Sequence, residues 1–469
     1  MWTEILLLLR YELVLTIGIF VLLFLKISNT GLKNETAMAV VNGILGIGLV
    51  LAVFSRTEGN AFGDMFITND LIHFEKAILF FATLMVSMQA ASWIKQHEHA
   101  MEFYLLMLAT LLGMCFMISA GNFLIFYLGL ELSTIPLAAM VNFNLREKRS
   151  SEGAFKMIIM ASTASAFFLF GLSWLYGTTG SIGFDAISQA INGTHLQQFA
   201  LILIIAGFAF KISAAPFHLW TADVYEGAPI AVTAYLSVVS KGSVLFAMIA
   251  ILMHVFEGLS GVWYQALVLL SIATMIIGNL FALRQQNMKR FLAFSSVAQV
   301  GFILVAMIGQ TGASVSALVF FVLVYLFSNL AAFGVVGVIA YQTGKERIDE
   351  YAGLYKTNPA LAWIMAIALF SLAGIPPTAG FFGKFFLLMA GSLSENWVLL
   401  IIAALNMIIA LYYYLRVVKS MFMDEAGAEG IPRFRPVRLA NVALYLCVAG
   451  IIATGLYGGI YEYIFSLVK

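Results

Sequence analysis

The sequence predicts an all-α polytopic membrane protein with about 14 transmembrane helices, and three observations support this fold class. Of its 469 residues, 62% are hydrophobic and only 10% are charged, and the mean hydropathy is +0.97. A soluble domain carries about 25% charged residues. Apolar windows of membrane-spanning length follow one another along the chain, and the basic residues between them gather on one side. This pattern excludes a soluble enzyme and indicates a protein embedded in a lipid bilayer.

The spans follow from a count of apolar windows, because a transmembrane helix needs about 20 consecutive apolar residues. The predicted spans are 5–25, 36–54, 74–94, 103–119, 122–143, 154–176, 199–224, 230–254, 264–283, 292–308, 314–341, 361–393, 397–421 and 441–467. The first window is too long for a signal peptide and has no evident cleavage site, so we interpret it as the first span. The stretches between spans are too short for a soluble domain.

The distribution of basic residues gives a second, independent test of this topology. When the loops are numbered alternately, one side holds Lys26, Lys33, Lys95, Arg146, Lys148, Arg149, Arg284, Lys289, Arg290, Lys345, Arg347, Lys356, Arg416, Lys419, Arg433, Arg435 and Arg438. The other side holds only Arg10, Arg56, Lys76 and Lys469. The basic loops therefore indicate the cytoplasmic side, and both termini are expected on the opposite side.

Two of the spans are long and interrupted by helix-breaking residues. Span 199–224 contains Pro216, and span 361–393 contains Pro376 and Pro377. Proline removes a backbone donor and clashes with the preceding turn, so each span is expected to be a pair of half-helices. Ordinary proline kinks without a role are the alternative interpretation. The breaks are about 160 residues, or five spans, apart, which predicts two inverted repeats such as those of many transporters.

This spacing predicts the organisation of the chain. Three transmembrane helices occupy residues 1–100, a first five-helix repeat occupies 101–258, a second occupies 259–422, and a C-terminal helix occupies 423–469.

Charged residues inside the predicted spans are the candidate functional residues. Glu131, Lys211, Lys241 and Lys384 all lie well inside apolar stretches. A charge at mid-bilayer costs roughly 2.5–3.5 kcal/mol on insertion scales, so such residues mark ion or proton pathways by default. Lys156 is a secondary candidate, since it lies near a span end and its side chain can extend to the interface.

The chemistry of these residue types suits proton transfer. Burial lowers the cost of deprotonating a lysine, whereas arginine stays charged, and none of the central positions is arginine. A carboxylate such as Glu131 can hold a proton on a nearby lysine and release it when that interaction weakens. A permanent buried ion pair is the alternative for these charges. His218, beside Pro216, fits either a relay or a donor to freed carbonyls. No spacing of Cys or His residues indicates a metal site.

Several segments of the chain are similar to one membrane-protein family. FKISAAPFHLWTADVYEGAP (Phe210–Pro229), NMKRFLAFSS (Asn287–Ser296) and LAGIPPTAGFFGKF (Leu372–Phe385) resemble the antiporter-like subunits of respiratory complex I, and specifically subunit N, which organelles call subunit 2. The similarity covers about residues 103–421. The length of the chain agrees, because the sister subunit L carries a long lateral helix and extra spans.

The resemblance implies a role for each candidate residue. Glu131 and Lys211 would form the input-side pair, Lys241 the central relay and Lys384 the exit group, with His218 among the connecting residues. Many relatives have a histidine at the position of Gln299, so a water molecule or a serine would have to bridge that point.

The resemblance also implies a proton-translocating subunit of NADH-quinone oxidoreductase in a bacterial inner membrane. This chain would bind no cofactor, while partner subunits would hold FMN, iron–sulfur clusters and quinone. Its partners would be other antiporter-like and small membrane subunits and the lipid bilayer, with no nucleic acid. The alternatives are a subunit of a multi-subunit Na⁺/H⁺ antiporter or of a membrane-bound hydrogenase, or a purely structural membrane scaffold.

Overall fold

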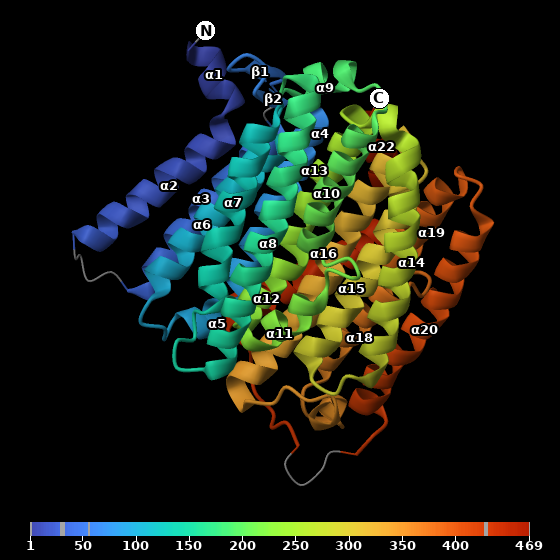
Figure 1. The fold of residues 1–469 in the computed structure, drawn as a ribbon. Helices are drawn as coiled ribbons and strands as arrows, with labels where there is room; N and C mark the ends of the chain where they lie inside the picture. Colours follow the sequence, from blue (N-terminus) through green and yellow to red (C-terminus); the bar gives the residue numbers. More distant parts are fainter. Residues whose placement is uncertain (1, 29–32, 55–56, 426–429, 469) are drawn as a thin grey trace. The chain divides into compact units, whose positions relative to one another are not determined.

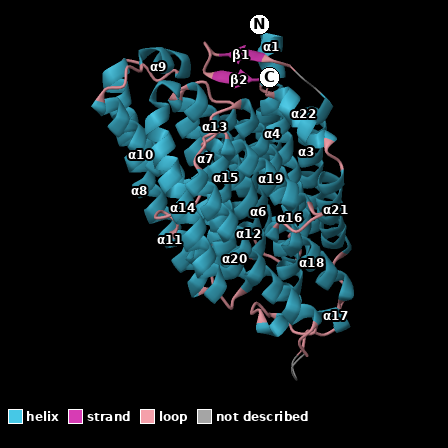
Figure 2. Cartoon of the chain, turned by 90° about the vertical axis from the view of Figure 1, so that its right-hand side faces the viewer, coloured by secondary structure: helices cyan, strands magenta, loops and turns pink. Residues whose placement is uncertain are grey.

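The computed structural model describes residues 2–28, 33–54, 57–425 and 430–468. Within these ranges the chain is almost wholly helical, and strands occur only in one short hairpin (Figures 1 and 2). Arg56 and Lys469, both used in the topology prediction, lie outside the described residues. The chain divides into two compact units. The first comprises Met1–Leu84, Ile94–Ile212 and Val239–Ala266, and the second comprises Met85–Trp93, Ser213–Val238 and Leu267–Lys469.

The first unit is a helical bundle with the hairpin at one end. Its elements are α1 (Trp2–Leu8), α2 (Arg10–Ile27), α3 (Asn34–Phe54), β1 (Gly59–Ala61), β2 (Phe66–Thr68), α6 (Ala100–Ile118), α7 (Phe123–Val141), α8 (Lys148–Thr179), α9 (Phe184–Ala190), α10 (His195–Lys211), α13 (Lys241–His254) and a 3-10 turn (Glu257–Leu259). Helix α6 packs against α2, α3, α7 and α13, while α8 packs against α7 and α10. Figure 1 shows α6, α7 and α8 as neighbouring, steeply inclined helices.

The second unit is built around α16. Its elements are α11 (Leu219–Gly227), α12 (Ile230–Tyr235), α15 (Met288–Met307), α16 (Gly312–Thr343), a 3-10 turn (Asp349–Tyr351), α17 (Leu354–Thr357), α18 (Pro359–Ala373), α19 (Ala379–Ser392), α20 (Trp397–Phe422), α21 (Arg438–Leu456) and α22 (Gly459–Leu467). Helix α16 contacts α12, α15, α18, α19, α21 and α22. Four elements contribute residues to both units, namely α4 (Asp70–Gln89), α5 (Ala91–Ile94), a π-helical turn (Leu236–Ser240) and α14 (Ser260–Arg284).

The predicted membrane fold is confirmed. In the described residues, 11 helices are long and apolar enough to cross a membrane, and α10, α18 and α19 are shorter apolar helices. Helix α2 is not among these because its 18 residues include the charges of Arg10, Glu12 and Lys26. The structure differs from the prediction at the first span, which is divided at Leu9 into α1 and α2, and at residues 177–198, where α9 forms.

The hairpin was not expected from the sequence. Strands β1 and β2 pair antiparallel, with Asn60 opposite Ile67. Ala61 and Phe66 pack against Leu8 in a small apolar cluster. The backbone N–H of Ile67 donates to the carbonyl of Ser119, just after α6, at 2.8 Å. The hairpin is therefore fixed to the ends of α1 and α6.

Both interruptions occur where the prolines predicted them. Helix α10 ends at Lys211 and α11 starts at Leu219, and the Ala215–Pro216 peptide between them is cis. Helix α18 ends at Ala373 and is capped by Gly374, whose φ of +86° is a left-handed conformation that favours glycine. A Cβ atom on Gly380, in the first turn of α19, would overlap the carbonyl oxygen of Ser371. The second break thus depends on glycine at two positions.

A close helix crossing positions the segment of α7 that carries Glu131. A Cβ atom on Gly129 would lie 2.7 Å from the carbonyl oxygen of Gly113 on α6, and one on Gly113 would lie 2.5 Å from the backbone nitrogen of Ser133. Small residues allow backbones to approach in this way in membrane bundles. Helices α6 and α7 are therefore held in direct backbone contact beside the candidate site.

Candidate functional site

The first part of the site lies in the first unit, around Lys211. This residue ends α10, and its Nζ donates a hydrogen bond to the Oγ1 of Thr134 on α7. Glu131 lies one turn before Thr134, and its carboxylate accepts a hydrogen bond from the hydroxyl of Ser165 on α8 at 2.5 Å. Glu131 also acts electrostatically on Lys211. Lys211 and Glu131 therefore each bind a hydroxyl side chain of another helix.

Lys241 lies at an irregular point of its helix. The helical segment Ile230–His254 is interrupted by a π-helical turn at Leu236–Ser240, and Lys241 directly follows this turn as the first residue of α13. Its side chain is only 2% exposed. Helix α13 packs against α6 and against α10, which carries Lys211. π-Bulges within helices frequently occur at functional sites.

Lys384 lies in the second unit and binds the end of a half-helix. Its Nζ donates to the carbonyl oxygen of Leu372 at 2.7 Å and to that of Ala373 at 3.2 Å, and its side chain is 1% exposed. These carbonyls lose their intrahelical partners because α18 stops at Ala373. A cation is favoured at this negative end of the helix dipole. The ring of Phe302 lies 5.0 Å from Nζ.

Gln299 is connected to Lys384 through one carbonyl group. The Nε2 of Gln299 donates to the Leu372 carbonyl at 3.0 Å and to the Tyr414 hydroxyl at 3.3 Å. The Leu372 oxygen thus accepts from both Gln299 and Lys384. The Oε1 of Gln299 is buried and has no hydrogen-bond partner within the described parts of the chain. A buried amide oxygen of this kind is a natural place for an ordered water molecule.

The remaining candidates are His218 and Lys156. His218 directly precedes α11 and is buried, and its ring lies 6.3 Å from that of Phe281. The side chain of Lys156 on α8 is 39% exposed and pairs with Glu152, four residues earlier, at 2.6 Å. The Lys156 side chain therefore extends toward the start of α8.

Sequence reasoning missed two kinds of residue. Thr134 and Ser165 have no distinguishing pattern, since hydroxyl residues are common in membrane helices. Glu12 and Lys76 were detectable, because both lie inside predicted spans. The topology prediction counted Lys76 among loop charges, and this was wrong. The structure buries it completely in α4, in an ion pair with Glu12.

The described residues contain no group of three or more His, Cys, Asp or Glu side chains that could hold a metal ion. Cys115 and Cys447 are buried free cysteines.

Thr134 offers a direct test of the contact with Lys211. We expect Thr134→Val, which keeps the shape and removes the hydroxyl, to slow proton translocation by about tenfold. A hydrogen bond to a charged group contributes about 1.5–3 kcal/mol, and about 1.4 kcal/mol corresponds to a tenfold change in rate. Proton uptake by membrane vesicles measures this effect. Thr110→Val is the matched control, because the Thr110 hydroxyl donates to the carbonyl of Leu106 in its own helix. Equal rates in the two variants would contradict the prediction.

Two broken apolar helices, each with a lysine beside the break, define a membrane subunit of the antiporter-like class. Residues 120–410 match the family model described as NADH:quinone oxidoreductase/Mrp antiporter, TM. A relative from Azobacteroides pseudotrichonymphae, named NADH-quinone oxidoreductase subunit N, is 44% identical over 457 residues, which cover 96% of this chain and 95% of the relative. The chain belongs to the family of NADH-quinone oxidoreductase subunit N.

Solved structures agree with this family. A chain in the structure of respiratory complex I from Thermus thermophilus with bound aureothin superposes with a TM-score of 0.83 at 28% identity, covering 96% of this chain and 97% of that chain. A chain of the Mrp complex from Dietzia sp. gives a TM-score of 0.87 at 22% identity, covering 100% and 97%, respectively. At that identity the second likeness shows the fold alone.

Proposed function

We propose that this chain is a proton-translocating membrane-arm subunit of an NADH-quinone oxidoreductase. Electron transfer from NADH to quinone takes place in partner subunits and drives the movement of protons through this subunit. The observation that carries the proposal is the burial of Lys241 and Lys384 in a chain of the subunit N family. Both lysines place an amine that can carry a proton inside an apolar bundle.

The candidate residues take successive roles in this mechanism. A change of charge near Glu131 shifts the proton held by Lys211, whose amine is positioned by Thr134. The proton then moves to Lys241 and onward to Lys384, with His218 among the connecting groups. At the far end, Lys384 and Gln299 both donate to the Leu372 carbonyl, which places Gln299 beside the exit group. A water molecule carries the proton past Gln299. Water is required there because glutamine itself does not titrate.

The membrane, the orientation and the partner subunits follow from the same proposal. The subunit lies in the inner membrane of a bacterium among other antiporter-like and small membrane subunits, with the basic loops in the cytoplasm and both termini in the periplasm. FMN, iron–sulfur clusters and quinone belong to partner subunits. The five-helix segments 101–258 and 259–422 act as two inverted repeats, each with one broken helix.

The assembled complex carrying Lys211→Ala tests the proposal. We expect proton pumping and quinone-coupled NADH oxidation to fall severely, while NADH oxidation by artificial acceptors in the peripheral subunits persists. Full pumping by this variant would refute the assignment. Co-purification of the chain with flavin and iron–sulfur subunits separates it from a Na⁺/H⁺ antiporter, which the Mrp likeness supports at the level of fold only.

A further inference from the structure

A second buried charged cluster lies in the first unit, outside the path described above. Lys76 on α4 and Glu12 on α2 form an ion pair of 2.6 Å. The side chains are 0% and 2% exposed, respectively. Lys76 lies about 9 Å along α4 from its first residue, Asp70, at a rise of about 1.5 Å per residue. The pair is therefore enclosed within the bundle, between the first turn of α2 and the second turn of α4.

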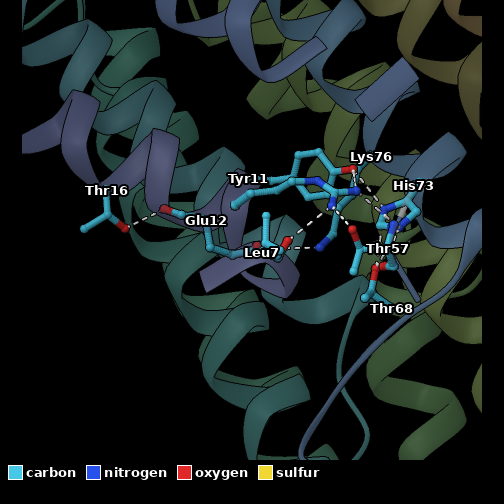
Figure 3. A network of polar contacts seen from close by, with 9 residues as sticks. Leu7, Tyr11, Glu12, Thr16, Thr57, Thr68, His73 and Lys76 are labelled. Atoms are coloured by element: carbon cyan, nitrogen blue, oxygen red, sulfur yellow. Dashed lines mark hydrogen bonds and ion pairs between the residues drawn. The ribbon is translucent and has the colours of Figure 1, made fainter. Parts of the chain in front are cut away.

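Titratable and polar groups surround this pair (Figure 3). The Tyr11 hydroxyl lies 2.7 Å from Arg10 Nη2, which donates to it, and 2.9 Å from Nδ1 of His73. The Nε2 of His73 lies 3.0 Å from the carbonyl oxygen of Thr57. The Tyr11 ring contacts both halves of the cluster, since its centroid is 5.6 Å from that of His73 and 5.1 Å from Lys76 Nζ.

The carboxylate of Glu12 has one oxygen available. Oε1 accepts from Lys76, whereas Oε2 is buried without a hydrogen-bond partner in the described ranges. A buried carboxylate oxygen without a partner requires a water molecule or a proton. A water molecule at Oε2 can accept or donate a proton, and a proton on Oε2 makes the group a carboxylic acid. In either case the carboxyl group can exchange a proton at this oxygen.

A purely structural role explains this arrangement poorly. Buried ion pairs often stabilise less than apolar side chains of similar volume, because removing both charges from water is costly. Here the pair is also placed next to a histidine and a tyrosine. The other nearby groups are Glu75, which is buried beside Lys76 in the sequence, and the buried thiol of Cys115 on α6, which interacts electrostatically with both members of the pair.

We propose that Glu12 and Lys76 form a second proton-transfer site of this subunit, which exchanges protons with the side of the membrane at which the β1–β2 hairpin lies. This inference rests on the proposed function. The Lys76 ammonium gives its proton to Glu12 Oε1, which leaves a neutral amine and a carboxylic acid. The carboxyl group turns so that the protonated oxygen faces water, and the acid gives its proton to that water. In the reverse steps, water returns a proton to the carboxylate and the carboxylic acid passes it to the neutral amine, which restores the ion pair.

The hairpin side is favoured by the direction of the network. His73 lies one turn before Lys76 on α4, nearer to the hairpin, and its Nε2 contacts Thr57, just before β1. The hydroxyl of Thr68, the last residue of β2, lies 3.4 Å from His73 Nδ1. His73 therefore links the hydroxyl of Tyr11, the neighbour of Glu12 in the sequence, to the Thr57 carbonyl and the Thr68 hydroxyl at the hairpin. On the predicted topology this is the side opposite the basic loops.

The test uses the assembled complex in sealed vesicles, with the ratio of protons pumped to NADH oxidised as the readout. The double variant Glu12→Gln/Lys76→Met removes both charges and keeps the side-chain shapes, so no charge is left buried and unpaired. We expect its pumping ratio to fall to that of Lys211→Ala. Tyr11→Phe keeps the ring that contacts Lys76 and removes only the hydroxyl bonded to His73, and its ratio is expected to fall below that of the wild type.

The control is the same pair of substitutions at an exposed ion pair, Glu35→Gln/Lys95→Met, where Lys95 and Glu35 lie 3.0 Å apart. This variant is expected to keep the wild-type ratio. A wild-type ratio in Tyr11→Phe, or in the assembled Glu12→Gln/Lys76→Met complex, would overturn the second site. If Lys211→Ala also pumped normally, the proposed function itself would be wrong, so the two failures are distinguishable.

Discussion

Replacement of Lys241 by methionine is expected to abolish proton pumping by the assembled complex while leaving the amount of complex in the membrane unchanged. Methionine is close to lysine in length and fills the same buried position, but it holds no proton. Quinone-coupled NADH oxidation should fall together with pumping. This is the largest functional effect that we expect from any single substitution in the chain.

The amount of complex is expected to stay unchanged because the buried charge of Lys241 is unfavourable for stability. A lysine at the centre of a membrane helix costs roughly 2.5–3.5 kcal/mol on insertion scales, and Lys241 is almost fully buried. Its removal should therefore leave the stability of the subunit unchanged or raise it. The π-helical turn before Lys241 shows that the helix departs from regular geometry at this residue. The buried charge and the irregular helix are both unfavourable for stability, and a residue with a purely structural role would require neither.

The measurement is fluorescence quenching by a pH-sensitive dye in sealed vesicles, calibrated against the rate of NADH oxidation. Lys419→Met is the matched control, because this lysine lies at the end of α20 with 66% of its side chain exposed. Exposed ion pairs contribute about 0–1 kcal/mol, so the control should assemble and pump normally. Wild-type pumping by Lys241→Met would remove Lys241 from the proton path.

Much of the fold could be predicted because the bilayer limits the possible structures. A membrane-spanning chain must satisfy its own backbone groups, so apolar windows indicate helices and prolines indicate breaks. The interruptions beside Lys211 and Lys384 were predictable on this basis. The hairpin at Gly59–Thr68 was missed because each strand has only three residues, too few to show an alternating pattern.

The partners of the buried charges could not be predicted from the sequence. Glu12 and Lys76 are 64 positions apart, and their ion pair exists only because α2 and α4 are brought together by folding. The carbonyl shared by Gln299 and Lys384 is a backbone group of Leu372, whose side chain gives no indication of the contact. The sequence could therefore show that charges lie in the membrane, and only the structure shows which groups they bind.

The second large effect is expected at Lys384, where two substitutions should separate two roles. Lys384 lies in α19, and its amine donates to the carbonyls of Leu372 and Ala373 at the end of α18. Lys384→Met leaves both carbonyls without this donor, and each unsatisfied buried group costs about 1–3 kcal/mol. We therefore expect less assembled complex with Lys384→Met, in addition to lost pumping. A Cβ atom on Gly374 would lie 3.1 Å from Cδ of Lys384, so glycine at the end of α18 leaves room for the lysine stem.

Lys384→Arg distinguishes the proton-transfer role from the structural one. The guanidinium group provides donors for both carbonyls and keeps the positive charge at the end of α18, but it does not release a proton at any accessible pH. We expect Lys384→Arg to assemble better than Lys384→Met and to pump no better. The amount of complex in the membrane and the ratio of protons to NADH give the two readouts. Pumping at the wild-type ratio by Lys384→Arg would show that a fixed charge suffices there and that Lys384 only caps the broken helix.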